Sequence, residues 1–94
     1  MARLRKQLPA HLGAGELRFR GFSGPVEYEV LGDPSSLRLG PLRLRGSFTA
    51  TPEIAAEAFH AGEAELKLQE GGAFRITLVG HSAGSDTAYF EMRV

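Results

Sequence analysis

The chain has 94 residues, of which 43% are hydrophobic and 23% are charged, and its eleven basic side chains balance eleven acidic ones. This length and composition fit one globular domain, and the lack of cysteine excludes disulfides, cysteine-based zinc sites and a thiol nucleophile. There is no apolar run of the roughly 20 residues that span a bilayer and no apolar stretch after the basic start, so we expect a cytoplasmic protein outside the membrane.

Residues 1–12 are predicted to form a flexible basic arm before a single β-rich domain of residues 13–94. Leucines recur in the arm at helical spacing, but Pro9 interrupts that pattern, because proline removes a backbone donor. The glycines of residues 13–15 mark the predicted boundary between the arm and the domain.

Residues 16–20 and 26–30 alternate apolar and charged side chains, which predicts two strands with one buried face each. The glycines and proline of residues 21–25 predict the turn between them. Opposite charges on neighbouring strands stabilise a sheet by roughly 0.2–1 kcal/mol per pair. We therefore expect ion pairs across the outward face, joining Arg18 and Arg20 to Glu27 and Glu29.

Residues 37–45 alternate leucine with arginine, and the alternation changes phase at Gly40-Pro41. Either a bulge in one strand or a tight turn between two short strands explains the change. Because proline cannot donate a hydrogen bond to a neighbouring strand, this stretch is expected to run along a sheet edge. Residues 46–50 are expected to lead into a helix.

Residues 52–61 form the one predicted helix. Thr51 is a good N-cap, Pro52 suits the first helical position and Gly62 suits the stop. Ten residues are too few for a helix to persist alone, so its apolar stripe must pack on the sheet. The stripe contains Ile54, Ala55, Ala58 and Phe59.

Three further alternating segments, residues 63–69, 73–78 and 88–94, predict three strands. The glycines of residues 70–72 predict a tight turn, and the polar residues 80–87 predict a longer hairpin loop. The side chains expected to point inward are Ala64, Leu66, Leu68, Phe74, Ile76, Leu78, Ala88, Phe90, Met92 and Val94.

This element order predicts a mainly β fold that borders on α+β. We expect a small antiparallel barrel or bent sheet of about six strands, with the helix of residues 52–61 between the third or fourth strand and the following strands. An α+β sheet with the helix packed across it is the alternative. The order resembles an OB-fold with one additional strand, a resemblance that carries no motif and implies no function.

The stretch Gly80-His81-Ser82-Ala83-Gly84 has the Gly-x-Ser-x-Gly pattern and locally resembles the nucleophile elbow of α/β-hydrolases. In that family a helix follows the serine, and an acid and a histidine come later in the chain. Here a strand pattern follows Ser82, and His81 is the last histidine. We interpret the motif as a hairpin loop and predict no catalytic residue and no enzyme activity.

The three histidines lie far apart in the sequence, at positions 11, 60 and 81. A zinc site needs three or four converging ligands, and no such spacing is present. Glu53, Glu57 and His60 share one helix face opposite the apolar stripe, which is typical of a solvent-exposed surface. The sequence therefore predicts no metal and no cofactor.

Charge is unevenly placed, because residues 1–45 hold eight basic and four acidic side chains, and residues 46–94 hold three and seven. Nine of the eleven basic residues are arginine, which suits two-point contacts to phosphate or carboxylate. The outward arginines predicted to form an anion- or partner-binding row are Arg18, Arg20, Arg38, Arg43 and Arg45.

Two functions are compatible with these features. The favoured one is a non-enzymatic interaction or assembly domain that binds a protein partner or itself, through exposed strand edges and the basic arm. The alternative is binding of an anion or nucleic acid by the arginine row. The zero net charge and the lack of aromatic residues among the arginines make a nucleic acid the less favoured partner.

Overall fold

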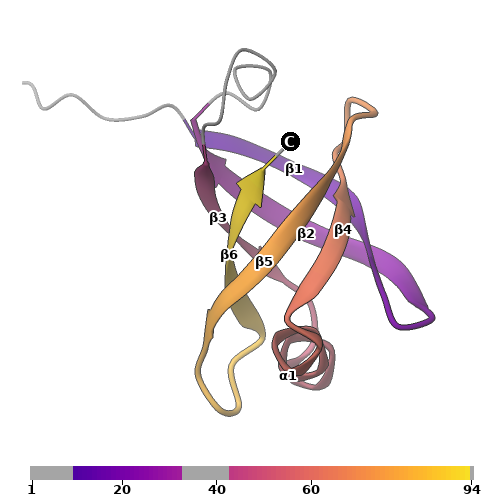
Figure 1. Ribbon diagram of the computed structural model, residues 1–94, viewed down its shortest axis with the longest axis vertical. Coiled ribbons are helices and arrows are strands. Elements are labelled where there is room, and N and C mark those ends of the chain that lie inside the picture. The colour runs from indigo at the N-terminus through magenta and orange to yellow at the C-terminus, as the bar shows by residue number, and fades with distance from the viewer. Residues whose placement is uncertain (1–9, 33–42, 94) are drawn as a thin grey trace, which may run out of the picture.

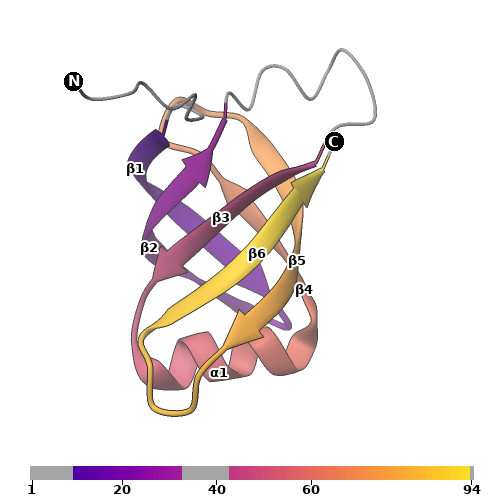
Figure 2. The ribbon, with the colours of Figure 1, turned by 90° about the vertical axis from the view of Figure 1, so that its left-hand side faces the viewer.

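A computed structural model describes residues 10–32 and 43–93 of the chain. The strands are β1 (Ala10–Phe19), β2 (Phe22–Leu31), β3 (Leu44–Thr49), β4 (Glu63–Lys67), β5 (Ala73–His81) and β6 (Thr87–Arg93), and helix α1 (Pro52–Ala61) connects β3 to β4. The six antiparallel strands close into a barrel in the order β1-β2-β3-β6-β5-β4. Helix α1 lies across one end of the barrel (Figures 1 and 2). The predicted mainly β antiparallel barrel with one short helix is therefore confirmed.

Apolar side chains fill the barrel interior, and the described residues include no buried polar or charged side chain. The rings of Phe48 and Phe90 stack at its centre, with centroids 6.4 Å apart. Alternate residues of each strand point inward, as closure of a barrel requires. The largest fully buried side chains are Phe48, Phe90, Leu17, Leu66, Ile76, Met92 and Val30.

Helix α1 begins and ends at the predicted residues. The hydroxyl of Thr51 accepts a hydrogen bond from the backbone N–H of Ile54 at 3.1 Å. Gly62 ends the helix with a φ of 86°, and its N–H donates to the carbonyl of Ala58 at 3.0 Å. The carbonyl of Gly62 then accepts a hydrogen bond from Leu78 in β5 at 2.8 Å, which ties the end of the helix to the barrel.

The face of α1 that packs on the barrel is narrower than the predicted stripe. Ala55 and Ala58 are fully buried, because short side chains let the helix approach the strands closely. Phe59 instead remains 39% exposed, and its ring contacts that of His81 with a centroid distance of 6.2 Å.

Strand β1 begins at Ala10, so the last three residues of the predicted arm, residues 1–12, belong to the barrel. The glycines of residues 13–15 lie within β1 and do not mark a boundary. The Tyr28 ring packs against these glycines and leaves no room for a side chain. A Cβ on Gly13 would lie 2.6 Å from the Tyr28 hydroxyl. Residues 1–9 lie outside the described residues.

Strand β3 corrects the expectation that residues 46–50 form a connection. Leu44 and Phe48 are buried in this strand, although Gly46 and polar neighbours weaken its alternation. Most of the predicted strand of residues 37–45, including the phase change at Gly40-Pro41, lies outside the described residues.

The barrel closes between β1 and β4 through three residue pairs: Glu16–Lys67, Leu17–Leu66 and Arg18–Glu65. Gln69 extends this closure past the end of β4. Its side-chain oxygen accepts a hydrogen bond from the N–H of Ala14, and its own N–H donates to the Tyr28 hydroxyl, both at 3.0 Å. The predicted turn at residues 70–72 follows, closed by a hydrogen bond from the N–H of Leu68 to the carbonyl of Gly72 at 2.7 Å.

The turn between β1 and β2 is shorter than the predicted turn of residues 21–25. It consists of Arg20 and Gly21, whose φ values of 45° and 82° fit a two-residue type I′ hairpin turn. Pro25 lies in β2, outside the part of β2 that pairs with β3, so one side of the strand is unpaired there, as proline requires.

Replacing Arg20 by asparagine is expected to stabilise the domain by about 0.5–1 kcal/mol, because asparagine tolerates the left-handed conformation that strains an arginine. Urea unfolding of Arg20→Asn against the parent measures the gain. Arg18→Asn, at an extended position of β1, is the control and should give no gain. A destabilised Arg20→Asn variant would contradict the turn conformation.

Candidate interaction surface

The barrel divides the arginines that were predicted to form one row. Arg18 and Arg20 lie at the β1–β2 turn, whereas Arg43 and Arg45 lie at the start of β3. Position 23 of β2 is opposite Arg18 and position 31 is opposite Arg45. Eight residues of an extended strand span roughly 26 Å. The four described arginines of the predicted row therefore form two separate pairs, and Arg38 lies outside the described residues.

The predicted ion pairs between β1 and β2 are wrong. Because the turn has only two residues, the register places Glu27 and Glu29 opposite Ala14 and Leu12. Arg18 instead lies 3.8 Å from Glu16 on its own strand and 3.9 Å from Glu65 on β4.

Glu16 accepts a hydrogen bond from the Ser23 hydroxyl across β1 and β2. This hydrogen bond lowers the pKa of Glu16; partial burial opposes the shift, and the charges of Arg18 and Lys67 reinforce it. A lowered pKa stabilises the fold above the ordinary pKa of glutamate, and this contribution is lost as the pH falls through the lowered value.

We expect Ser23→Ala to raise the pKa of Glu16 toward its ordinary value, because the hydroxyl donor is lost. An NMR titration of the glutamate carboxyl carbons measures the pKa directly. Ser47→Ala, on the outer face of β3, is the matched control and should leave it unchanged. An unaltered pKa in Ser23→Ala would show that the hydrogen bond is not its main cause.

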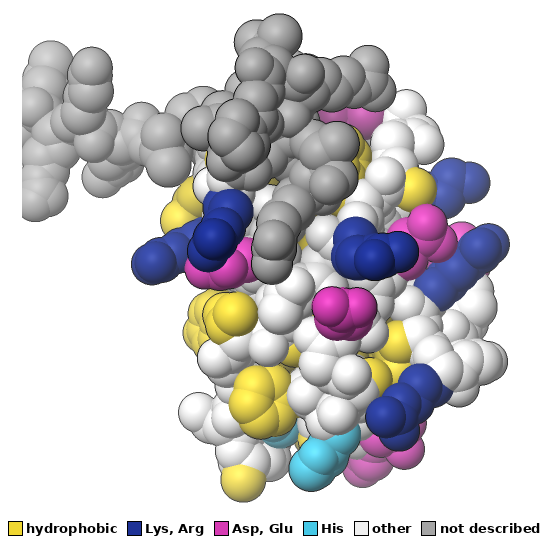
Figure 3. All heavy atoms as spheres, in the orientation of Figure 1, with side chains coloured by type: hydrophobic (Ala, Val, Ile, Leu, Met, Phe, Trp, Pro, Cys, Tyr) yellow, Lys and Arg dark blue, Asp and Glu magenta, His cyan; other side chains and the backbone are white. Residues whose placement is uncertain are grey.

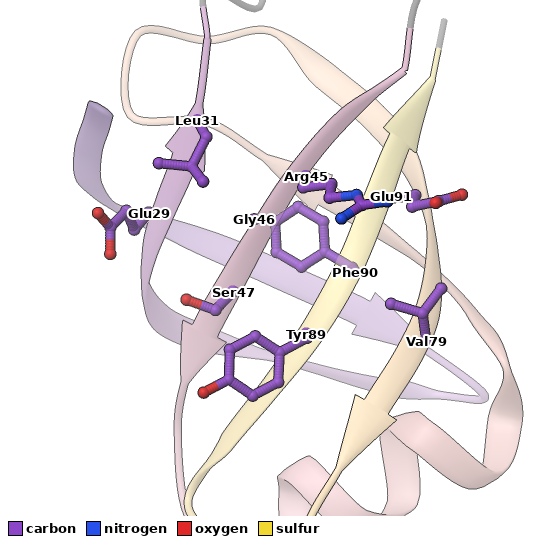
Figure 4. A pocket seen from close by; sticks show the side chains of 9 residues that line it. All are labelled: Glu29, Leu31, Arg45, Gly46, Ser47, Val79, Tyr89, Phe90 and Glu91. Atoms are coloured by element: carbon purple, nitrogen blue, oxygen red, sulfur yellow. The ribbon is translucent and has the colours of Figure 1, made fainter. Parts of the chain in front are cut away.

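A groove of about 550 Å³ lies on the outer face of the barrel, across β2, β3, β6 and β5 (Figure 4). Two neighbouring cross-strand rows build it. Leu31, Arg45 and Glu91 are opposite one another in the first row, and Glu29, Ser47 and Tyr89 in the second. The outward phase of all three strands therefore places residues from distant parts of the sequence around one hollow.

Gly46 lies in the floor of the groove, beside the short side chain of Ser47. The ring of Phe90 packs directly beneath this glycine: a Cβ at position 46 would lie 2.7 Å from the ring and 2.5 Å from the carbonyl oxygen of Glu29. The centre of β3 therefore offers little side-chain bulk between its two neighbouring strands.

Large apolar side chains border the groove and remain exposed. Leu31 is 41% exposed, Val79 is 53% exposed and Tyr89 is 54% exposed. A bulge between Leu78 and Gly80 interrupts the pairing of β5 with β6 at Val79. Hydrophobic side chains also reach the surface beside charged ones in Figure 3.

These side chains account for most of the exposed apolar bulk of the described residues. Five large hydrophobic side chains are exposed there, and three border the groove. A fourth, Leu12, is 72% exposed and lies on β1 opposite Glu29, next to the groove. Contiguous exposed apolar groups are a mark of binding surfaces, whereas scattered ones are ordinary.

Charged side chains lie among the apolar ones, and in the first row Arg45 and Glu91 stand between Leu31 and β5. Glu91 lies 3.5 Å from Arg43, which neutralises it. Arg45 and Glu29 have no ion-pair partner among the residues that the structure describes. The groove thus carries one unneutralised base and one unneutralised acid among its apolar side chains.

The Gly-x-Ser-x-Gly stretch runs from the end of β5 into the hairpin loop before β6. Ser82 is exposed, and the Nε2 atom of His81 lies 2.9 Å from the carbonyl oxygen of Ser85. Strand β6 follows this loop, whereas a helix follows the serine in a nucleophile elbow. Within residues 10–32 and 43–93, no group of three or more histidine or acidic side chains is placed to hold a metal ion.

The helix of the described chain is too short to cross a bilayer.

Leu31, Val79 and Tyr89 are not among the binding residues predicted from the sequence. The alternation of residues 88–94 already places Tyr89 on the outward face of β6. That placement is the signal in the sequence that a large apolar group faces solvent. The bulge at Val79 and the adjacency of β2, β3 and β6 depend on the sheet order, which the sequence did not specify.

Comparisons of the chain with protein-family models, with curated proteins and with solved structures found no match.

Proposed function

We propose that this protein is a non-enzymatic interaction domain that binds a protein partner through the groove on β2, β3, β6 and β5. The observation that carries the proposal is the meeting of three exposed apolar side chains, Leu31, Val79 and Tyr89, around one hollow. Protein interfaces usually combine apolar with polar and charged side chains, and tyrosine is among the residues that contribute most to their affinity.

The closed barrel changes the expected route of association. The sequence predicts exposed strand edges, but the described strands close into a barrel and leave only short unpaired stretches, such as residues 22–26 of β2. A partner that adds a strand needs such an edge. Because the exposed apolar side chains of the groove project from the outer face, we expect these side chains, and not the short unpaired stretches, to hold the partner.

Anion binding by the arginines has less support from this geometry. The two described pairs are separated along β2, and one member of each pair already contacts a carboxylate: Arg18 contacts Glu16 and Glu65, and Arg43 contacts Glu91. A polyanion would have to compete with these carboxylates for both arginines.

A photoreactive benzophenone side chain at position 79 tests the proposed surface in living cells. We expect covalent adducts with a protein from position 79 and few from position 53 on α1, the control. Leu31→Glu should abolish the adducts, because it places a charge in the apolar wall of the groove. Equal cross-linking from both positions, or adducts that persist in Leu31→Glu, would contradict the proposal.

A further inference from the structure

The two unneutralised charges of the groove lie on opposite sides of its centre. Arg45 and Glu29 occupy neighbouring strands in adjacent rows, opposite Leu31 and Ser47 respectively. Figure 4 shows the Arg45 guanidinium directed toward β6 and the Glu29 carboxylate directed away from it. A twofold axis that passes between them would bring each arginine to the glutamate of a second copy.

The groove also places a projecting ring beside a hollow. Tyr89 stands 54% exposed on β6, and the hollow over Gly46 lies next to it. In a dimer about the axis between Arg45 and Glu29, the Tyr89 ring belongs to the face that is turned toward the second copy.

The overall charge of the chain favours a partner of the same kind. Eleven basic and eleven acidic side chains leave no net charge, so two copies do not repel each other at long range. A strongly acidic or basic partner would find only one opposite unneutralised charge in the groove, and beside it one like charge.

We propose that the occupant of the groove is a second copy of this chain, in a twofold dimer where Arg45 of each copy pairs with Glu29 of the other. This inference rests on the proposed function, because it names the partner of the same groove. The dimer covers the groove with its bordering side chains Leu31, Val79 and Tyr89 and leaves α1 outside the interface.

A charge exchange tests the dimer specifically. Arg45→Glu and Glu29→Arg each place like charges across the twofold axis, so each variant alone should dissociate about tenfold more readily, or more. A mixture of the two variants restores both ion pairs in a mixed dimer. Light scattering on a size-exclusion column, with sedimentation over a range of concentrations, measures each species, and native mass spectrometry identifies the mixed dimer.

Two controls make the same charge changes at the α1 end of the barrel: Arg20→Glu and Glu57→Arg should dimerise like the parent. Tyr89→Ser is a second groove variant, which removes the projecting ring without adding charge, and it should also weaken the dimer. Circular dichroism checks that each variant is folded.

A parent that stays monomeric at all concentrations would overturn the dimer, as would a mixture that fails to associate. If position 79 of a monomeric parent still cross-links to another protein, the interaction function stands and the dimer alone is wrong. If the parent is monomeric and position 79 gives no adduct, both are wrong.

Discussion

Phe90→Ala is expected to lower the free energy of unfolding by about 3–5 kcal/mol, the usual loss for a phenylalanine truncated in a core. The side chain is fully buried, stacks on Phe48 and fills the space beneath Gly46. Gly46 has no side chain that could move into the cavity left by the Phe90 ring. The cavity therefore closes only if β3 moves. We therefore expect a loss in the upper part of this range.

Urea unfolding followed by circular dichroism measures this loss, at a protein concentration that keeps parent and variants monomeric. Tyr89→Ala is the matched control, since it truncates the next residue of the same strand on the outer face. It should cost less than about 1 kcal/mol. Equal losses at the two positions would mean that the inward and outward faces of β6 are exchanged.

Phe74 shows that a side chain with the inward phase of its strand is not always fully buried. The sequence predicts it in the core with Ile76 and Leu78, and it does share their phase in β5. It is only partly buried, however, whereas Ile76 is fully buried. Phe74→Ala should therefore cost less than Phe90→Ala.

The helix was predictable to the residue because its signals are local. The N-cap hydroxyl of Thr51, the proline after it and the left-handed stop at Gly62 each act within one turn of the chain. The inward faces of β2, β4, β5 and β6 were also predictable, since alternation is a property of neighbouring residues.

The extents of β1 and β3 were not predictable, because the glycines in these strands make room for the side chains of residues that are distant in the sequence. Glycine in a sequence usually indicates a break. Here Gly13 and Gly15 accommodate the ring of Tyr28, and Gly46 accommodates the ring of Phe90. These contacts exist only after β1 has paired with β2 and β3 with β6, so the isolated segments look weaker as strands than they are.

The groove could not be predicted from the sequence for a related reason. Its position depends on the strand order and on the register, and a two-residue turn at Arg20 and Gly21 changes the register of β1 against β2. The expected charge pairs of Glu27 and Glu29 were lost with it. Glu29 was thereby left without an ion-pair partner among the described residues, which is the feature that the proposed dimer uses.

Gly15→Ala is expected to lower the free energy of unfolding by about 2–3 kcal/mol, near the upper limit for an overpacked site. An added Cβ would collide with the backbone carbonyl oxygen of Lys67 and lie 3.0 Å from the ring of Tyr28. A backbone oxygen cannot turn aside as a side chain can, so β1 and β4 must separate. Only three residue pairs join these strands, and the closure of the barrel depends on them.

Hydrogen exchange locates the damage, because the amides of β4 should exchange faster in Gly15→Ala, while those between β2 and β3 change less. Gly80→Ala is the matched control: an added Cβ there would lie 3.8 Å from Tyr89, an ordinary contact, and no positive φ is required. That variant should be neutral or more stable by up to about 1 kcal/mol, because alanine restricts the unfolded chain. If both glycines accept alanine equally, β1 and β4 are not in contact at Gly15, and the sheet is open where the structure closes it.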